Sequence, residues 1–257
     1  MGEEGGAIRV ERQGAVLLVT IDRPHVRNAI DRDAAWAISA AMDRLDAEQD
    51  LFLGIVTGAG GIFSAGADLK AARVRGAGDL PDRGNFGLCR KPPNKPLIAA
   101  IEGLALGGGL EMALACDLIV AARGARMGLP EVRHNLVAAA GGAFRLPRRL
   151  PYHVAAEIAL TAQPRTAEFF HHHGLVNRLA APGEALAEAQ RLAEELLANG
   201  PLALAATTRI LRASADWTEE EAWRLQEPII DAVRHSEDRA EGLRAFAEKR
   251  PPVWIGR

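Results

Sequence analysis

The feature of this sequence that most restricts its fold is the alternation of short apolar runs with segments of helical periodicity. Four runs rich in Val, Ile and Leu have the length of buried strands: residues 15–22, 52–57, 96–102 and 117–122. A further strand is predicted to begin at Ile8. Strands that alternate with helices favour an α/β fold with largely parallel strand pairing.

Helices are predicted between these strands. The first has an N-cap at Asp31 and continues to about Glu48, with four apolar residues on one face, namely Ala35, Ile38, Met42 and Leu45. The second covers residues 108–115. Each half of the strand-rich region therefore has the same order of strand, helix and strand.

The last part of the chain differs in character, because four helical stretches follow Glu184. Their boundaries are marked by a C-cap signal at Asn199–Gly200, Pro201 at a helix start, a capping box of Thr218 with Glu221, and an N-cap at Ser236. We therefore predict a core of residues 1–195 and a helical region of residues 196–257.

Charge and cysteine content exclude several classes of protein. The net charge of −2 provides no basic surface and argues against nucleic acid as a partner. Cys89 and Cys116 have no paired spacing, which argues against a disulfide framework or thiolate metal site and favours the cytoplasm. The N-terminal residues lack the pattern of a signal peptide, and no apolar stretch reaches the roughly 20 residues of a membrane helix.

Two segments rich in small residues are candidates for binding negative charge through backbone N–H groups. In residues 60–70, small side chains at positions 65–67 leave the backbone accessible after a strand. In residues 103–111, the three glycines at positions 107–109 stand at a helix start, where free N–H groups and the dipole favour an anion. Two such sites can hold one oxyanion, although glycines taken singly often only permit tight turns.

Two glutamates accompany these segments. Glu111 closes the second segment, one helical turn beyond Gly108, and Glu131 follows the turn of residues 128–130. A carboxylate in apolar surroundings is costly for structure alone, and a pair of them suits acid and base chemistry. The alternative for Glu131 is an inert carboxylate at a helix start.

Several ordered segments resemble the crotonase, or enoyl-CoA hydratase/isomerase, superfamily. These are residues 62–70, 105–111, 116–117, 128–131 and 236–250. The resemblance extends from about Ile8 to Trp254. It implies a spiral of strand-strand-helix units, a C-terminal helical trimerisation region, and a homotrimer or a hexamer of two trimers.

The resemblance also implies a coenzyme A thioester as substrate, with no separate cofactor and no metal. Ala67 and Gly108 match the residues whose N–H groups polarise the thioester carbonyl, and Glu111 and Glu131 match the two hydratase carboxylates. Family members that only isomerise a double bond commonly lack one carboxylate, so the pair favours addition of water to a 2-enoyl-CoA. The resemblance assigns Glu111 to the water and Glu131 to C2, although a close pair can share both roles.

The chain departs from the family pattern in one segment. Asn135 stands where the family favours Gly, and Ala138 and Ala139 stand where Pro-Gly is common. Asn tolerates a left-handed backbone, and Ala139 can still offer its N–H to the water. The shape of the pocket at this point is expected to differ.

Six residues are candidates for contact with coenzyme A: Arg23, Ala65, Asp68, Leu69, Lys70 and Lys249. Lys249 would act from a neighbouring subunit, and the alternative for both lysines is an ordinary surface position. Residues 71–93, rich in Gly, Pro and Arg, are predicted to form a mobile lid or a pocket wall.

Other functions fit the sequence less well. Ser64 lacks the first Gly of a hydrolase nucleophile elbow, and residues 58–63 fail the dinucleotide-binding pattern. Residues 171–173 are consecutive histidines before a Gly, which indicates a helix C-terminus rather than a metal site. The remaining alternatives are an isomerase, a dehydratase of a branched or polar acyl-CoA, and a non-catalytic acyl-CoA binding protein.

Overall fold

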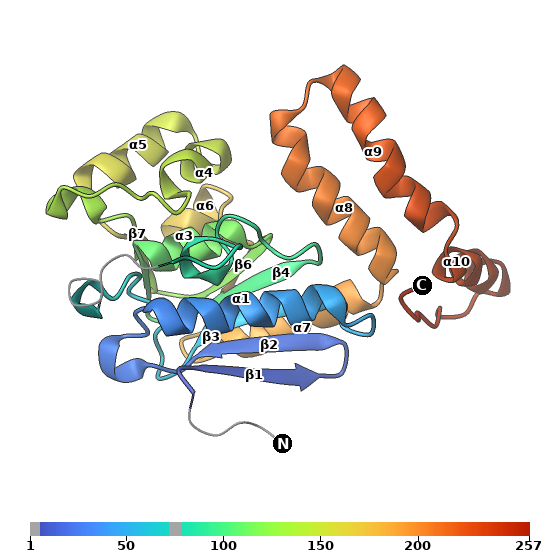
Figure 1. Cartoon of the computed structure of the whole chain (residues 1–257), viewed down its shortest axis with the longest axis horizontal. Helices are drawn as coiled ribbons and strands as arrows, with labels where there is room; N and C mark the ends of the chain where they lie inside the picture. The colour runs from blue at the N-terminus through green and yellow to red at the C-terminus, as the bar shows by residue number, and fades with distance from the viewer. Residues whose placement is uncertain (1–5, 72–78) are drawn as a thin grey trace.

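A six-stranded sheet forms the centre of the chain in the computed structural model, which describes residues 6–71 and 79–257 (Figure 1). The strand order is β1-β2-β3-β4-β6-β9. The first pair is antiparallel and the other four are parallel. The strands are β1 (Ile8–Gln13), β2 (Val16–Ile21), β3 (Leu53–Gly58), β4 (Leu97–Ile101), β6 (Leu118–Ala122) and β9 (Arg178–Ala180).

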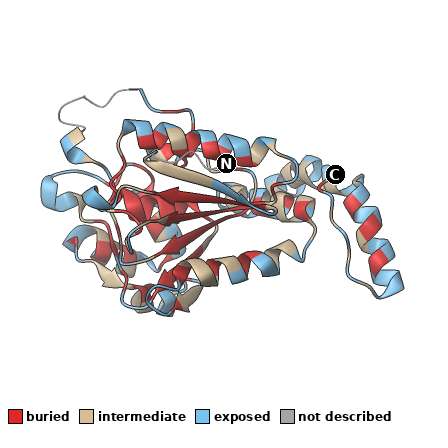
Figure 2. Cartoon of the chain, turned by 90° about the horizontal axis from the view of Figure 1, so that it is seen from below, coloured by how far each residue is buried: buried red, intermediate tan, exposed pale blue. Residues whose placement is uncertain are grey.

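Both faces of the sheet are buried at β2, β3, β4 and β6, which explains why these four strands are continuous apolar runs. On one face, Leu17 and Val19 belong to the cluster that includes the apolar side of α1 (Arg32–Ala47). On the other face, Leu18 belongs to a second cluster with the apolar side of α7 (Ala185–Leu197). Figure 2 shows the buried strands between helices on either side.

A smaller sheet has the order β5-β7-β8. Its strands are β5 (Leu104–Leu106), β7 (Arg126–Gly128) and β8 (Arg165–Thr166). Strand β5 leads directly into α3 (Gly108–Ala115), so β4, β5, α3 and β6 repeat the strand-strand-helix-strand order of the first unit. The predicted α/β fold is confirmed, and β5 is an addition that the sequence pattern did not reveal.

The remaining elements of the core are short. They are η1 (Pro24–Val26), η2 (Asn85–Gly87), η3 (Glu131–His134), α4 (Gly142–Arg149), α5 (Tyr152–Thr161) and α6 (Ala167–His172). Among the helices of residues 6–71 and 79–257, none combines the length and apolar character that a membrane crossing requires.

The C-terminal helices extend away from the sheet (Figure 1). They are α8 (Pro201–Ala213), η4 (Ser214–Asp216), α9 (Glu219–Arg234) and α10 (Glu237–Glu248). The capping box at Thr218 and the N-cap at Ser236 are confirmed. The C-cap prediction at Gly200 is wrong, because this residue has φ −60° and serves as the N-cap of α8.

Asp117 joins the base of these helices to the central sheet. Its carboxylate accepts the Leu97 N–H at the start of β4 (2.8 Å) and two hydrogen bonds from Arg212 of α8 (2.7 and 2.5 Å). The residue that follows the buried Cys116 therefore has a structural role.

The segment predicted as a lid or pocket wall packs partly into the core over residues 79–93. Leu88 and Cys89 are buried in the main core, and Arg83 is buried against α1, where it pairs with Asp43 and Asp46 (2.7 Å each). The rest of the predicted lid, residues 72–78, lies outside the described residues.

Candidate active site

Two backbone turns meet at the start of α3. Gly66 has φ +92°, and a Cβ added to it would lie 2.7 Å from the Gly108 nitrogen. The Ile30 N–H donates to the Gly66 carbonyl (2.8 Å), and the Asp68 N–H donates to the Ile30 carbonyl (2.9 Å). Between these two bonds, the Ala67 N–H faces away from Ile30.

Neither the Ala67 nor the Gly108 N–H donates a hydrogen bond to any other described residue. The Gly108 N–H is unpaired because it lies in the first turn of a helix. The two donors predicted to bind an oxyanion therefore belong to two turns in direct contact, and the helix dipole adds to their positive potential.

Glu111 lies on the first turn of the same helix and is only 3% exposed. Its Oε1 accepts the Gly142 N–H at 2.9 Å. Burial raises the pKa of this carboxyl, and the negative charge of Glu131 raises it further, whereas the Gly142 N–H opposes the shift. Burial and the charge of Glu131 therefore both increase the proton affinity of Glu111.

Glu131 begins η3 and approaches the same helix start. A Cβ added to Gly107 would lie 3.1 Å from the Glu131 Oε1. The Oε2 atom is buried and has no hydrogen-bond partner among the described residues. Burial raises the pKa of this carboxyl as well. An unpaired buried oxygen is costly for structure alone, which favours a role toward a ligand.

The turn that carries the departures from the family pattern borders Glu111. Asn135 adopts the expected left-handed backbone, with φ 54°. Ala138 is buried, and a Cβ added to Gly142 would lie 2.9 Å from its Cβ. Ala139 is exposed in the same turn, so its position fits an N–H that faces solvent or a bound water.

Two side chains at this site were not anticipated. Phe86, at φ 58°, presses its ring against Gly108, where an added Cβ would overlap the ring. Arg145 of α4 is close enough to Glu111 to act on the charge of that carboxylate. The sequence contains a signal for the turn at Phe86, namely Gly84-Asn-Phe-Gly87, because two glycines so close together indicate an irregular turn.

The residues near position 68 that were predicted to contact coenzyme A differ in their exposure and in their hydrogen-bond partners. Arg23 is held by Asp31 (2.8 Å) and Asp68 (3.3 Å). Asp68 also accepts the Ala71 N–H (3.0 Å), and this bond, with Arg23, keeps the pKa of Asp68 below its usual range. Leu69 and Lys70 are exposed at the helix start that follows. Ala65 is partly buried and donates its N–H to the Arg27 carbonyl (3.0 Å).

Lys249 is not part of this cluster within one chain. It is the left-handed C-cap of α10, which lies at the far end of the molecule from α3 (Figure 1). A contact between Lys249 and the ligand would need a second subunit, as the sequence analysis expected.

The three consecutive histidines are at a helix end, as predicted. Helix α6 ends at His172, and His173 is its C-cap. The His171 Nδ1 lies 2.8 Å from the Val176 carbonyl oxygen. In the part of the chain that the structure describes, no three His, Cys, Asp or Glu side chains are arranged to hold a metal ion.

Comparison with known proteins agrees with this geometry. The enoyl-CoA hydratase/isomerase family model matches residues 11–257. The chain belongs to this family. An enoyl-CoA hydratase of Mycobacterium tuberculosis is 40% identical over 262 residues, covering 99% of this chain and 98% of that protein. A carnitinyl-CoA dehydratase of Salmonella enteritidis is also 40% identical, over 260 residues, with 98% and 99% covered.

The fold of the enoyl-CoA hydratase/isomerase family is equally clear from solved structures. The crystal structure of a probable enoyl-CoA hydratase/isomerase from Mycobacterium abscessus superposes with a TM-score of 0.94, at 51% identity, and covers 98% of this chain and 100% of that one. The predictions of the crotonase fold and of an enzyme of the lyase class are confirmed at this level. The roles of individual residues stay predictions.

Proposed function

We propose that this member of the enoyl-CoA hydratase/isomerase family adds water across the 2,3 double bond of a 2-enoyl-CoA and forms a 3-hydroxyacyl-CoA. The observation that carries the proposal is the meeting of Glu111 and Glu131 at the helix start where the Ala67 and Gly108 N–H groups are free. An isomerase does not need both carboxyls, and a non-catalytic binding protein needs neither.

The proposed mechanism follows from these groups. The Glu111 carboxylate takes a proton from water as the water oxygen forms a bond to C3 of the thioester. The electron pair of the double bond moves toward the thioester carbonyl, where the Ala67 and Gly108 N–H groups stabilise the oxyanion by roughly 3 to 4 kcal/mol each. Protonated Glu131 then gives its proton to C2, and water, H and OH, has been added overall.

The surroundings of the carboxyls support this division of labour. Burial raises the pKa of both groups, and the negative charge of Glu131 raises the pKa of Glu111 further, so the two carboxyls interact as they titrate. One carboxylate and one carboxylic acid is the protonation state that concerted addition of water requires. Ala139 would offer its N–H to the water from the adjoining turn.

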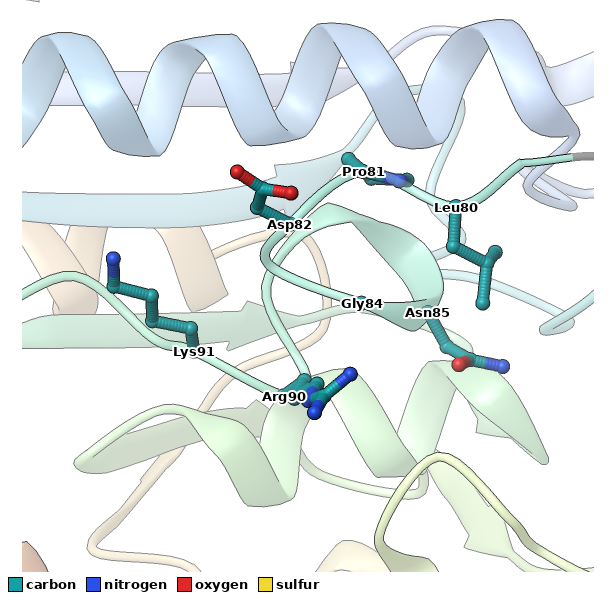
Figure 3. A pocket seen from close by; sticks show the side chains of 7 residues that line it. All are labelled: Leu80, Pro81, Asp82, Gly84, Asn85, Arg90 and Lys91. Atoms are coloured by element: carbon teal, nitrogen blue, oxygen red, sulfur yellow. The ribbon is translucent and has the colours of Figure 1, made fainter.

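A second candidate is hydration or dehydration of a polar acyl-CoA. Relatives named carnitinyl-CoA dehydratase and enoyl-CoA hydratase have the same identity to this chain, 40%. A cavity of about 570 Å³ next to Phe86 is lined largely by polar and charged residues: Leu80, Pro81, Asp82, Gly84, Asn85, Arg90 and Lys91 (Figure 3). A polar acyl group would find partners there that a plain alkyl chain does not need.

We also propose that the active form is a homotrimer. Helices α8 to α10 expose large apolar side chains in the single chain: Leu211, Trp223, Leu243 and Phe246. Exposed apolar side chains of this size favour an interface. Association would also allow Lys249 to reach the coenzyme A of a neighbour.

The experiment follows the absorbance of the conjugated enoyl thioester with crotonyl-CoA, a longer 2-enoyl-CoA and crotonobetainyl-CoA. Glu111→Gln and Glu131→Gln should each lower kcat by roughly 10² to 10⁴-fold, because each removes an acid or base. Binding of a saturated acyl-CoA should change little. Glu194→Gln, an exposed glutamate of α7, is the matched control.

The outcomes separate the candidates. Crotonyl-CoA turned over fastest supports the simple hydratase, and a preference for the betaine thioester supports the polar alternative. Unchanged turnover in both Gln variants would refute the two-carboxyl mechanism. A folded protein that binds acyl-CoA and hydrates none of the three would refute the proposed function, and a 3-enoyl-CoA would then test isomerisation.

A further inference from the structure

Arg145 lies between two turns that contact different parts of the candidate active site. It is a half-buried residue of α4. Its Nη2 donates to the Cys89 carbonyl (2.6 Å), and its Nη1 donates to the Ala140 carbonyl (3.3 Å). The Phe144 ring lies 5.3 Å from its guanidinium carbon. No described carboxylate forms an ion pair with Arg145 within 4.0 Å, so its direct partners are two backbone oxygens.

The first turn, which ends at Gly142, holds the Glu111 carboxylate. The Gly142 N–H donates to the Glu111 Oε1, and a Cβ added to Gly142 would lie 3.1 Å from that oxygen. Gly141 has φ +113°, and an added Cβ would overlap the Arg145 guanidinium. The turn is therefore shaped to let Arg145 pass closely and reach the Ala140 carbonyl.

The second turn, residues 84–89, contacts the first turn of α3 through Phe86. Its Phe86 has a left-handed backbone, which is a costly conformation for an aromatic residue and persists only where the surroundings enforce it. Gly87 packs against α1, where an added Cβ would lie 2.7 Å from the Ser39 nitrogen. The Cys89 N–H closes the turn on the Asn85 carbonyl (3.2 Å).

Arg145 thus donates hydrogen bonds to two turns. One turn carries Phe86, whose ring contacts Gly108, and the other turn holds Glu111. We propose that Arg145 is a positioning residue that fixes the distance between the Glu111 carboxyl and the Gly108 N–H. This inference rests on the proposed function and adds a residue to it.

The charges around Glu111 give this proposal a measurable signature. The titratable groups that face it are Glu131 of η3, Arg145 of α4 and the buried Cys89 thiol. The positive charge of Arg145 lowers the pKa of Glu111, against the larger effect of burial. Removal of the charge should make Glu111 hold its proton to higher pH.

The test compares pH profiles of kcat for the wild type, Arg145→Gln, Arg145→Lys and Arg148→Gln. Arg148 is the matched control, because it lies on the same helix 5.9 Å from the same Phe144 ring, yet its side chain is 52% exposed. Arg145→Gln should lower kcat roughly 10- to 100-fold through misplacement, and its acidic limb should move to higher pH. Arg145→Lys should keep the limb in place and recover only part of kcat, since one ammonium cannot copy the planar fork.

Two results would overturn the inference. One is a folded Arg145→Gln enzyme whose kcat and acidic limb match those of Arg148→Gln, and the other is a lowered kcat with no movement of the limb. If Arg145→Gln does not fold, wild-type kcat in Arg145→Lys would overturn the positioning role. If the wild type has no hydratase activity, the proposed function fails by itself. The carbon-13 titration of Glu111, assigned with Glu111→Gln, then still tests the charge effect, and an unchanged midpoint in the Arg145 variants would overturn it.

Discussion

The contact between Gly108 and Phe86 allows a quantitative test of how the start of α3 is held. Gly108 has a backbone conformation that other residues can adopt, and the nearest atoms to an added Cβ all belong to the Phe86 ring. Gly108→Ala would by itself favour a helix, by up to about 1 kcal/mol. Overlap with the ring costs about 1 to 3 kcal/mol in a packed site, so a net loss of roughly 1 to 2 kcal/mol is expected.

The same substitution should behave differently without the ring. Phe86→Gly removes the overlapping atoms and also places Gly at φ 58°, where an aromatic residue is strained. In that background Gly108→Ala should be neutral or slightly stabilising. The expected coupling free energy between the two positions is therefore about 1 to 3 kcal/mol in favour of the double variant.

The assay is urea unfolding of the wild type, both single variants and the double variant, with free energies compared at equal slopes. Gly200→Ala is a control, because its φ is −60° and its added Cβ would meet no atom closer than 3.7 Å. Equal destabilisation by Gly108→Ala with and without the Phe86 ring would refute the packing argument. A hydration rate that recovers together with stability would connect this contact to the Gly108 donor.

Three further predictions concern stability and binding. Burial raises the pKa of Glu111 above its ordinary value of 4.5, so as pH rises the folded state keeps this proton longer than the unfolded state does, and the resulting stabilisation is lost as pH passes the folded pKa. In thermal melts from pH 4 to pH 8, Glu111→Gln should therefore gain stability relative to the wild type. A constant difference between the two proteins would contradict this. Asp117→Asn should lower the free energy of unfolding in urea by about 1 to 3 kcal/mol, because it weakens the hydrogen bonds to Arg212 and Leu97. An unchanged free energy of unfolding would show that other contacts hold α8. Lys70→Ala should raise the KM for the thioester several-fold with kcat unchanged, and a KM that also stays unchanged would leave Lys70 as a surface lysine.

Periodicity was sufficient to predict the strands β1, β2, β3, β4 and β6 and the helices α1, α3 and α7. The apolar runs became β2, β3, β4 and β6, because strands buried on both faces need apolar side chains at every position. Asp31 caps α1 through the Ala34 N–H (2.9 Å), as its residue type indicated. Short-range signals of this kind depend on few neighbours and can therefore be interpreted locally.

The short strands β5, β7, β8 and β9 and the helices α4 and α5 were not predicted from the sequence. Strand β5 has three residues and lies within the Gly-rich motif, where no alternation is visible, and its pairing with β7 is what defines it. Gly200 was interpreted as a C-cap, but the nearby Pro201 start uses it as an N-cap. The strand β5 does not follow from a local pattern, whereas the helix start at Pro201 was predicted from one.

The candidate site was predictable in its parts but not in its assembly. The sequence indicated Glu111, Glu131 and two segments of small residues from residue type, and the family resemblance selected Ala67 and Gly108 within these segments. The bond from Gly142 to Glu111 spans 31 residues, and the left-handed turn at Phe86 is enforced by packing against α1. Contacts of this range depend on tertiary structure, which residue spacing does not specify.

The close packing of glycines at the start of α3 has a consequence for how an enzyme of this design can diversify. Side chains cannot be introduced at Gly66, Gly108 or Gly109 without collision with the backbone of the adjoining turn or with the Phe86 ring. The predicted oxyanion donors are main-chain atoms, so among the amino acids only Pro, which has no N–H, removes one directly. New substrate preferences must therefore arise in neighbouring side chains such as Phe86, and random mutagenesis for altered specificity is best confined to those turns.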